Sequence, residues 1–281
     1  MGKTKIQEVV NALERFAPLP LQEGFDNAGL QVGLTETQEV SGALLCLDVT
    51  EAVVDEAVAL KCNLIVSHHP LIFHALKRIS GENDVQRAVC KAIKNDITVV
   101  SMHTNMDNAP GGVNYKIAEK MELEGLTPFG PQKSAQRPAS PGSTTADGES
   151  ETVVGASGIV GTFKEPMSAQ SFIKMLKSTF DVDCVMANQP LRRPIVKVAV
   201  CGGAGAFLLD DAIRAGADAF VTGEMHYHDY FGHDQEIQIA VIGHYQSEQY
   251  TNEVFRDIIE SNFPDVKCFL SQANTNPIVY L

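Results

Sequence analysis

The chain has 281 residues, enough for one large domain or two ordinary ones, each with a core of its own. Its formal net charge of −13 argues against nucleic acid as a main partner, because phosphate binding normally needs a basic face. No apolar run approaches the ~20 residues of a membrane-spanning helix, and the N-terminal segment lacks the apolar core of a signal peptide. Six cysteines without a C-x-x-C pair fit reduced thiols. We therefore expect a cytoplasmic protein with no membrane partner.

The first half of the chain alternates apolar runs with amphipathic segments, the pattern of an α/β fold. Three apolar runs are expected to form strands: residues 42–48, 63–67 and 96–102. An amphipathic helix is expected over residues 6–16, and the helix after the first strand can be capped by Asp48 or Thr50. Asp26 and Asn27 favour a structural turn.

The second half repeats this organisation, with an amphipathic helix expected over residues 169–180. Its strands are expected at residues 196–201, 217–222 and 237–243. Laid over the first half without gaps, Cys46 falls on Cys201 and Ser67 falls on Thr222. We interpret this match as a duplication, rather than as the general likeness of all strand–helix units. Alternating strands and helices imply largely parallel or mixed sheets with right-handed crossovers.

The boundaries follow from composition. We expect a first α/β half over residues 1–128 and a second over residues 153–281. Residues 129–152 are expected to form a flexible linker or loop, because they are rich in Pro, Ser, Thr, Ala and Gly and show no apolar periodicity. The expected fold class is therefore α/β, with two duplicated halves.

Histidines and carboxylates gather where the expected strands end. The first half carries S-H-H-P at residues 67–70 and H-T-N-M-D at residues 103–107, and the second carries T-G-E-M at 222–225 and H-Y-Q-S-E at 244–248. Ligands of such sheets bind beyond the carboxyl ends of the strands. Imidazoles and carboxylates suit divalent metals, and a carboxylate can bridge two of them. We favour a metal site over an ordinary polar cluster, with these ligands: His68, His69, Asp107, His244 and Glu248.

Other groups near these motifs have more than one reading. His103 can be a metal ligand, a group that orients a ligand, or a proton-transfer residue. Glu224 aligns with a ligand position, and both Glu224 and His228 can be acid–base or supporting groups. The candidate catalytic residues are His103, Glu224 and Glu248. The glycine-rich segment 202–205 indicates a tight strand-to-helix turn more than a phosphate cradle, since it lacks a full dinucleotide or P-loop pattern.

The chain resembles the Nif3-like proteins, also labelled GTP cyclohydrolase 1 type 2 homologs. The motifs S-H-H-P-L-I-F, H-T-N-M-D-N-A-P-G-G-V-N, T-G-E-M-H-Y-H-D and G-H-Y-Q-S-E carry the resemblance, together with D-N-A-G-L-Q-V-G from residue 26. It covers nearly the whole chain outside the linker. It implies two intertwined α/β domains, a dinuclear metal centre and a toroidal homohexamer. The positions that match the family's metal ligands are the same five side chains.

The function implied by this resemblance is a metal-dependent hydrolase. The expected reaction opens the imidazole ring of GTP by attack of a metal-bound hydroxide and releases formate, with His103 or Glu224 moving protons. Two divalent ions per chain are expected, Zn, Mn or Fe, with Co also suited to these donors. Two alternatives remain open. One is a metal-binding, metal-delivery or scaffold protein without turnover, and the other is a two-metal phosphoesterase acting on a small phosphorylated metabolite.

Overall fold

The structure is a computed structural model that describes residues 3–33, 38–137 and 151–279. The chain forms two compact units. The first unit comprises residues 1–109, 134–153 and 251–281, and the second comprises residues 110–133 and 154–250. The units therefore differ in their bounds from the consecutive segments expected from the sequence. Residues 138–150 of the expected linker lie outside the described residues, and flanking parts of that segment are strand.

The first unit is built on a five-stranded mixed sheet in the order β1-β4-β3-β2-β11. Its strands are β1 (Gly29–Val32), β2 (Ala43–Cys46), β3 (Leu64–Ser67), β4 (Thr98–Ser101) and β11 (Cys268–Leu270). Strand β1 is antiparallel to β4, and the other neighbours are parallel. Every residue of β2, β3 and β4 is buried, as expected for central strands covered on both faces.

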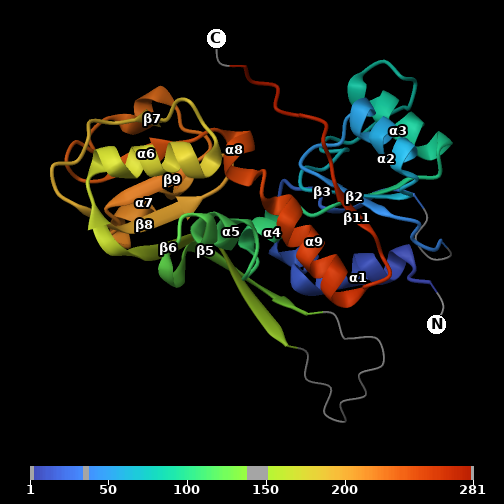
Figure 1. Cartoon of the computed structure of the whole chain (residues 1–281), viewed down its shortest axis with the longest axis horizontal. Coiled ribbons are helices and arrows are strands. Elements are labelled where there is room, and N and C mark those ends of the chain that lie inside the picture. The colour runs from blue at the N-terminus through green and yellow to red at the C-terminus, as the bar shows by residue number, and fades with distance from the viewer. Residues whose placement is uncertain (1–2, 34–37, 138–150, 280–281) are drawn as a thin grey trace. The chain divides into compact units, whose positions relative to one another are not determined.

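Helices cover both faces of this sheet (Figure 1). They are α1 (Ile6–Phe16), α2 (Glu51–Leu60), α3 (Asp84–Lys94) and α9 (Thr251–Asn262), with the short α4 (Thr104–Asn108) and the 3-10 turn η1 (Leu19–Leu21). Helices α2 and α3 pack on one face through Val54 and Val89, which join a core cluster with Ile65. Helix α9 contacts α1, β2 and β11, which explains why residues 251–281 belong to this unit.

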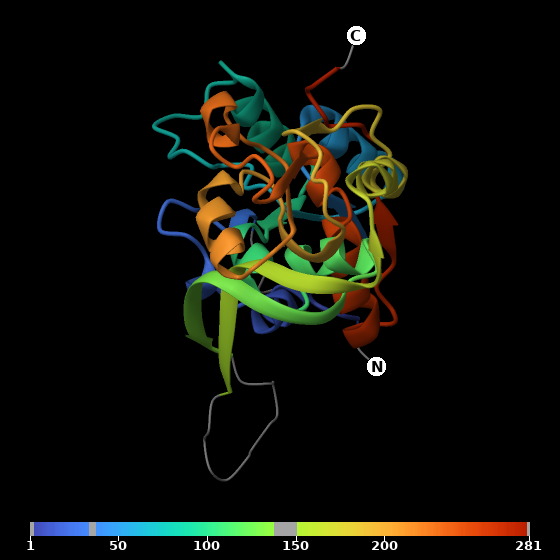
Figure 2. The same ribbon diagram turned by 90° about the vertical axis from the view of Figure 1, so that its left-hand side faces the viewer.

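The second unit is built on a six-stranded sheet in the order β5-β6-β8-β9-β10-β7. Its strands are β5 (Glu124–Gln136), β6 (Thr152–Met167), β7 (Met186–Ala187), β8 (Ile195–Cys201), β9 (Ala219–Thr222) and β10 (Gln238–Val241). Strands β8, β9 and β10 are parallel, whereas β6 is antiparallel to β8 and β7 is antiparallel to β10. The long strands β5 and β6 cross the front of this unit in Figure 2.

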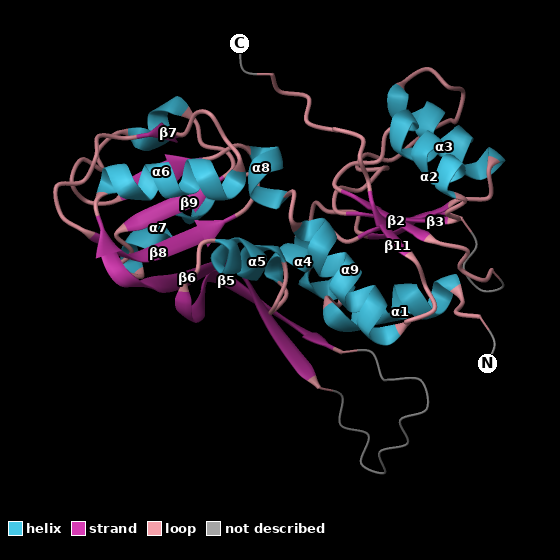
Figure 3. Cartoon of the chain, viewed as in Figure 1, coloured by secondary structure: helices cyan, strands magenta, loops and turns pink. Residues whose placement is uncertain are grey.

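The helices of the second unit are shown in cyan in Figure 3. They are α5 (Val113–Lys120), α6 (Ala169–Phe180), α7 (Leu209–Arg214) and α8 (His244–Glu248), with the 3-10 turns η2 (Ala206–Leu208) and η3 (Tyr227–Tyr230). Leu208 and Ala212 pack on one face of the sheet against Phe220. Phe172 of α6 is fully buried, and its ring lies 6.1 Å from that of Phe163 on β6. Among the described residues, no helix combines the length and apolar character needed to cross a bilayer.

The strand register is the same in the central pairs of both sheets. Cys46 lies opposite Ser67 where β2 meets β3, and Cys201 lies opposite Thr222 where β8 meets β9. These are the residues that coincide when the two halves of the sequence are aligned without gaps. The structure therefore agrees with that alignment at the strand ends where the candidate site residues begin.

Candidate metal-binding site

The first unit brings four candidate residues to the carboxyl ends of β3 and β4. His68 and His69 directly follow β3, and His103 and Asp107 lie at the start and within the one-turn helix α4 after β4. Because β3 and β4 are parallel and Ser67 pairs with Ser101, both sets of side chains emerge at the same edge of the sheet. The positions of these four residues at strand ends follow the sequence prediction.

The three imidazoles form a tight group. His68, His69 and His103 each offer a ring nitrogen, and these atoms all lie within 4.8 Å of one another. Their ring centroids are 4.9 to 5.3 Å apart. Three histidine nitrogens at such spacing are a donor set that Zn and similar divalent ions accept.

Each imidazole in this group is held through its Nδ1 atom. Nδ1 of His68 lies 2.9 Å from the carbonyl oxygen of Met102, which can only accept a hydrogen bond. Nδ1 of His69 lies 2.7 Å from Oδ1 of Asp48, and Nδ1 of His103 lies 2.7 Å from Oδ1 of Asp26. Oxygen partners of this kind orient metal-binding histidines, because they keep the proton on Nδ1 and leave the lone pair of Nε2 for a ligand.

Asp107 faces the most buried of these rings. Its Oδ1 lies 3.6 Å from Nε2 of His68, whose side chain is 0% exposed while that of Asp107 is 20% exposed. With the proton of His68 on Nδ1, this contact places two electron-pair donors side by side in a region that is largely shielded from water. A cation or a proton between them removes that repulsion, so the geometry fits a metal ion.

The two supporting aspartates are both held as carboxylates. Burial raises the pKa of Asp26, but the hydrogen bond and charge of His103 and hydrogen bonds from Thr104 outweigh it and lower the pKa to about 2. Burial likewise raises the pKa of Asp48, whereas the hydrogen bond and charge of His69, and a 2.7 Å hydrogen bond from Thr275, lower it overall. Negative charge behind each imidazole makes the ring a stronger metal ligand.

The second unit assembles a smaller set at the end of β10. His244 and Glu248 are the first and last residues of α8, so they lie one helical turn apart on the same face. Nε2 of His244 is 3.1 Å from Oε2 of Glu248, whose side chain is only 4% exposed. Nδ1 of His244 is 2.7 Å from Oε1 of Glu224. Glu224 therefore supports His244 as Asp26 supports His103.

The glycine-rich segment is a packing turn. Gly203 has φ +59°, and a Cβ atom at this position would collide with the carboxylate of Glu248. The backbone N–H groups of Gly202 and Gly203 donate to Asn114 Oδ1 and Ser247 Oγ. Gly205 donates likewise to the side-chain oxygen of a threonine. Because these N–H groups are already engaged, the segment acts as a strand-to-helix turn, the reading favoured from the sequence.

Sequence reasoning missed two residues of this site. Asp26 was expected to form a structural turn and Asp48 to cap a helix, yet each binds a histidine of the candidate site. The cap of α2 is Thr50, whose side chain accepts a hydrogen bond from the N–H of Val53. His228 lies in η3 with its ring 5.2 Å from that of Tyr227.

The fold and these residues define a two-unit α/β protein with clustered imidazoles and carboxylates able to hold metal ions. Residues 4–277 match the family model Duf34/NIF3 (NGG1p interacting factor 3), so the chain belongs to this family.

Known relatives agree with this assignment. The chain is 33% identical over 281 residues to a GTP cyclohydrolase 1 type 2 homolog of Clostridium perfringens, covering 99% of this chain and 100% of the relative. It is 31% identical to NIF3-like protein 1 of Drosophila melanogaster, covering 98% of this chain and 89% of the relative. The crystal structure of Staphylococcus aureus hypothetical protein SA1388 superposes with a TM-score of 0.85 at 26% identity, covering 100% of both chains.

Proposed function

We propose that this protein is a dinuclear metal-dependent hydrolase. The proposed ligands of two divalent ions are His68, His69, Asp107, His244 and Glu248. The observation that carries the proposal is the contact of His68 with Asp107, in which two buried or largely buried donor atoms lie 3.6 Å apart. The orienting oxygens behind the imidazoles support it, since such partners accompany metal-binding histidines.

The proposed reaction is a GTP cyclohydrolase-type opening of the purine imidazole ring with release of formate. Relatives named GTP cyclohydrolase 1 type 2 homolog support this choice. When bound, two divalent ions would acidify a water molecule and stabilise developing negative charge. Asp26 keeps the proton of His103 on Nδ1, so Nε2 of His103 can accept a proton during the reaction. Glu224 holds His244 and is half-exposed, so it is the second candidate for proton transfer.

The experiment is metal analysis by mass spectrometry on protein purified without chelators, together with a formate assay on GTP. Two ions per chain with GTP-dependent formate are expected. Two ions without formate would retain the site and favour the alternative, a metal-binding or metal-delivery protein. The phosphoesterase alternative predicts phosphate release from simple esters. The backbone N–H groups of Gly202 and Gly203 already donate to side chains, so the glycine turn does not offer them to a phosphate.

A variant of His103 distinguishes proton transfer from metal binding as the role of this residue. His103→Gln is expected to abolish formate release while two ions per chain remain, because Gln cannot exchange a proton near neutral pH. Loss of one ion in this variant would instead make His103 a ligand, as its distance to the other imidazoles allows. Assembly as a homohexamer and a cytoplasmic location belong to the same proposal, and sedimentation of the purified protein tests the first.

A further inference from the structure

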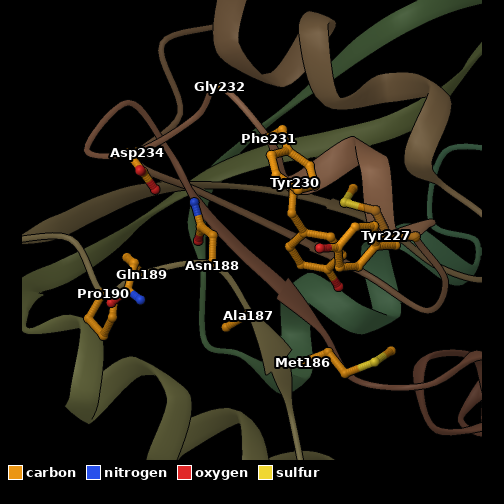
Figure 4. Close-up of a pocket in the computed structure, with 11 residues that line it drawn as sticks. Met186, Ala187, Asn188, Gln189, Pro190, Tyr227, Tyr230, Phe231, Gly232 and Asp234 are labelled. Carbon is orange, nitrogen blue, oxygen red and sulfur yellow. The ribbon is translucent and has the colours of Figure 1, made fainter.

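The second unit contains a cavity that the proposed metal ligands do not use. Its volume is about 790 Å³, within the range of roughly 300–1,000 Å³ typical of small-molecule sites. It lies between the segment around β7, from Met186 to Pro190, and the segment around η3, from Met225 to Asp234 (Figure 4). Met225 directly follows Glu224, the partner of His244, so the cavity adjoins the metal-binding residues of the same unit.

One wall of the cavity is aromatic. The side chains of Tyr227 and Phe231 are 73% and 61% exposed, and their ring centroids lie 5.2 Å apart in an edge-to-face arrangement. The turn that carries them is fixed by a 2.9 Å hydrogen bond from the N–H of His226 to Asp229. Figure 4 shows the rings of Tyr227, Tyr230 and Phe231 gathered on one side. Exposed aromatic faces held in place in this way suit a planar ring that stacks on them.

The opposite wall is polar. Oδ1 of Asn188 accepts hydrogen bonds from Gln238 and Ile239, so this amide fixes the wall and is not available to a ligand. Unlike Asn188, Gln189 and Asp234 have side chains that are available to a ligand. They form no hydrogen bond or ion pair with the residues that the structure describes. A carboxylate and an amide facing an aromatic wall select a ring that carries N–H donors on its edge.

The charge of the cavity excludes phosphate groups as its ligand. The described residues that line it include Asp234 but no Lys or Arg. A phosphate in this cavity would meet negative charge without a compensating cation, so the phosphates of a nucleotide have to lie elsewhere. The base of a nucleotide carries no such penalty, because it is planar, largely apolar on its faces and polar at its edge.

We propose that this cavity binds a guanine base, which stacks on the ring of Tyr227 beside Phe231 and donates its N1–H and 2-amino hydrogens to Asp234. Two adjacent N–H donors match the two oxygens of one carboxylate. The choice of guanine among planar bases rests on the proposed function, whereas the preference for a planar ring with N–H donors rests on the cavity alone. Tyr227 and Asp234 are then the residues that determine which nucleotide the enzyme accepts.

The test is equilibrium dialysis of the full-length, metal-loaded protein against guanosine, inosine and inorganic tripolyphosphate. Inosine lacks the 2-amino group, and tripolyphosphate probes the metal ions without a base. The variants are Tyr227→Ala and Asp234→Asn. Phe207→Ala is the matched control, because Phe207 lies in the same unit, is 62% exposed and does not line the cavity.

Guanosine is expected to bind more tightly than inosine. Tyr227→Ala should weaken guanosine binding at least about fivefold through lost stacking. Asp234→Asn should weaken guanosine about tenfold and inosine much less, because a hydrogen bond to a carboxylate is lost. Tripolyphosphate binding should be unchanged in both variants, and Phe207→Ala should behave as the unaltered protein.

Absence of saturable guanosine binding, or binding that neither variant weakens, would overturn the inference. So would a Tyr227→Ala protein that changes its sedimentation but not its guanosine affinity, since the aromatic wall would then join copies of the chain. The formate assay separates this inference from the proposed function. Guanosine binding without formate release retains the base site and rejects the hydrolase. Formate release with an unchanged KM for GTP in Tyr227→Ala retains the hydrolase and rejects the base site.

Discussion

Replacing Asp26 by Asn tests the network behind His103. The carboxylate of Asp26 accepts hydrogen bonds from Nδ1 of His103, at 2.7 Å, and from the N–H of Thr104, at 3.0 Å. These contacts, against the opposing effect of burial, lower its pKa from 3.8 to about 2. A lowering of about 1.8 in pKa corresponds to about 2 kcal/mol of folding free energy at pH 7, since one pKa unit is worth about 1.4 kcal/mol.

The sign of the pH dependence follows from the lowered pKa. The stabilisation by Asp26 is complete above its ordinary pKa of 3.8 and is lost as the pH falls through about 2. Asp26→Asn should therefore reduce the free energy of unfolding by about 2 kcal/mol at pH 7 and by about half as much at pH 3. Urea denaturation of chelator-treated protein at both pH values measures this difference without the contribution of metal binding.

Asp265→Asn is the matched control for this experiment. Asp265 also accepts hydrogen bonds from the N–H and hydroxyl of a threonine, Thr4, and these lower its pKa, but it has no histidine partner. Asp26→Asn should lower formate release about tenfold or more, because His103 loses the carboxylate that keeps its proton on Nδ1, and Asp265→Asn should leave formate release unchanged. An equal loss of stability at pH 3 and pH 7 in Asp26→Asn, with unaltered formate release, would refute the reasoning.

Three further variants test the rest of the site. Glu248→Gln should lose metal and formate release together, and two ions retained per chain would contradict its role as a ligand. Gly203→Ala should lower metal content because the new Cβ collides with Glu248; Gly216→Ala, which has a similar positive φ but open space around it, should keep the metal. Asp48→Asn should lower metal affinity about tenfold or more, measured by chelator competition, because His69 loses its orienting carboxylate. Its control is Thr50→Ala, which should cost about 1 kcal/mol in urea denaturation with unchanged metal content, through loss of the α2 cap.

The strand-end residues of the site were predictable from the sequence. The central strands are short, mostly apolar runs, and the amphipathic helices expected at residues 6–16 and 169–180 have the same bounds in the structure. Parallel neighbours end at one edge of a sheet, so the residues after β3 and β4 could be placed together from the order of apolar runs along the chain. The placement of His68 and His103 at the same edge of the sheet follows directly from this rule.

The supporting carboxylates and the edges of the sheets were not predictable in the same way. Asp26 lies 77 positions before His103, and an aspartate beside an asparagine is equally typical of a turn. Strand β7 has two residues, and β11 has three, too few to show a period of two. The cavity of the second unit was missed for a related reason. Met186 belongs to none of the quoted motifs, and the two-residue strand β7 that carries it is positioned by pairing with β10.

The pairing of β11 with β2 has a consequence for how the chain folds during synthesis. Ala43 lies opposite Cys268, so β2 lacks one of its two neighbours until almost all of the described chain has been made. During that interval an apolar strand presents unpaired backbone groups, which is the condition that promotes aggregation and calls for chaperones. The second unit contains no segment later than residue 250 and can close earlier. Truncation before residue 268 would therefore damage the first unit, the one that holds His68 and His69, and leave the other intact.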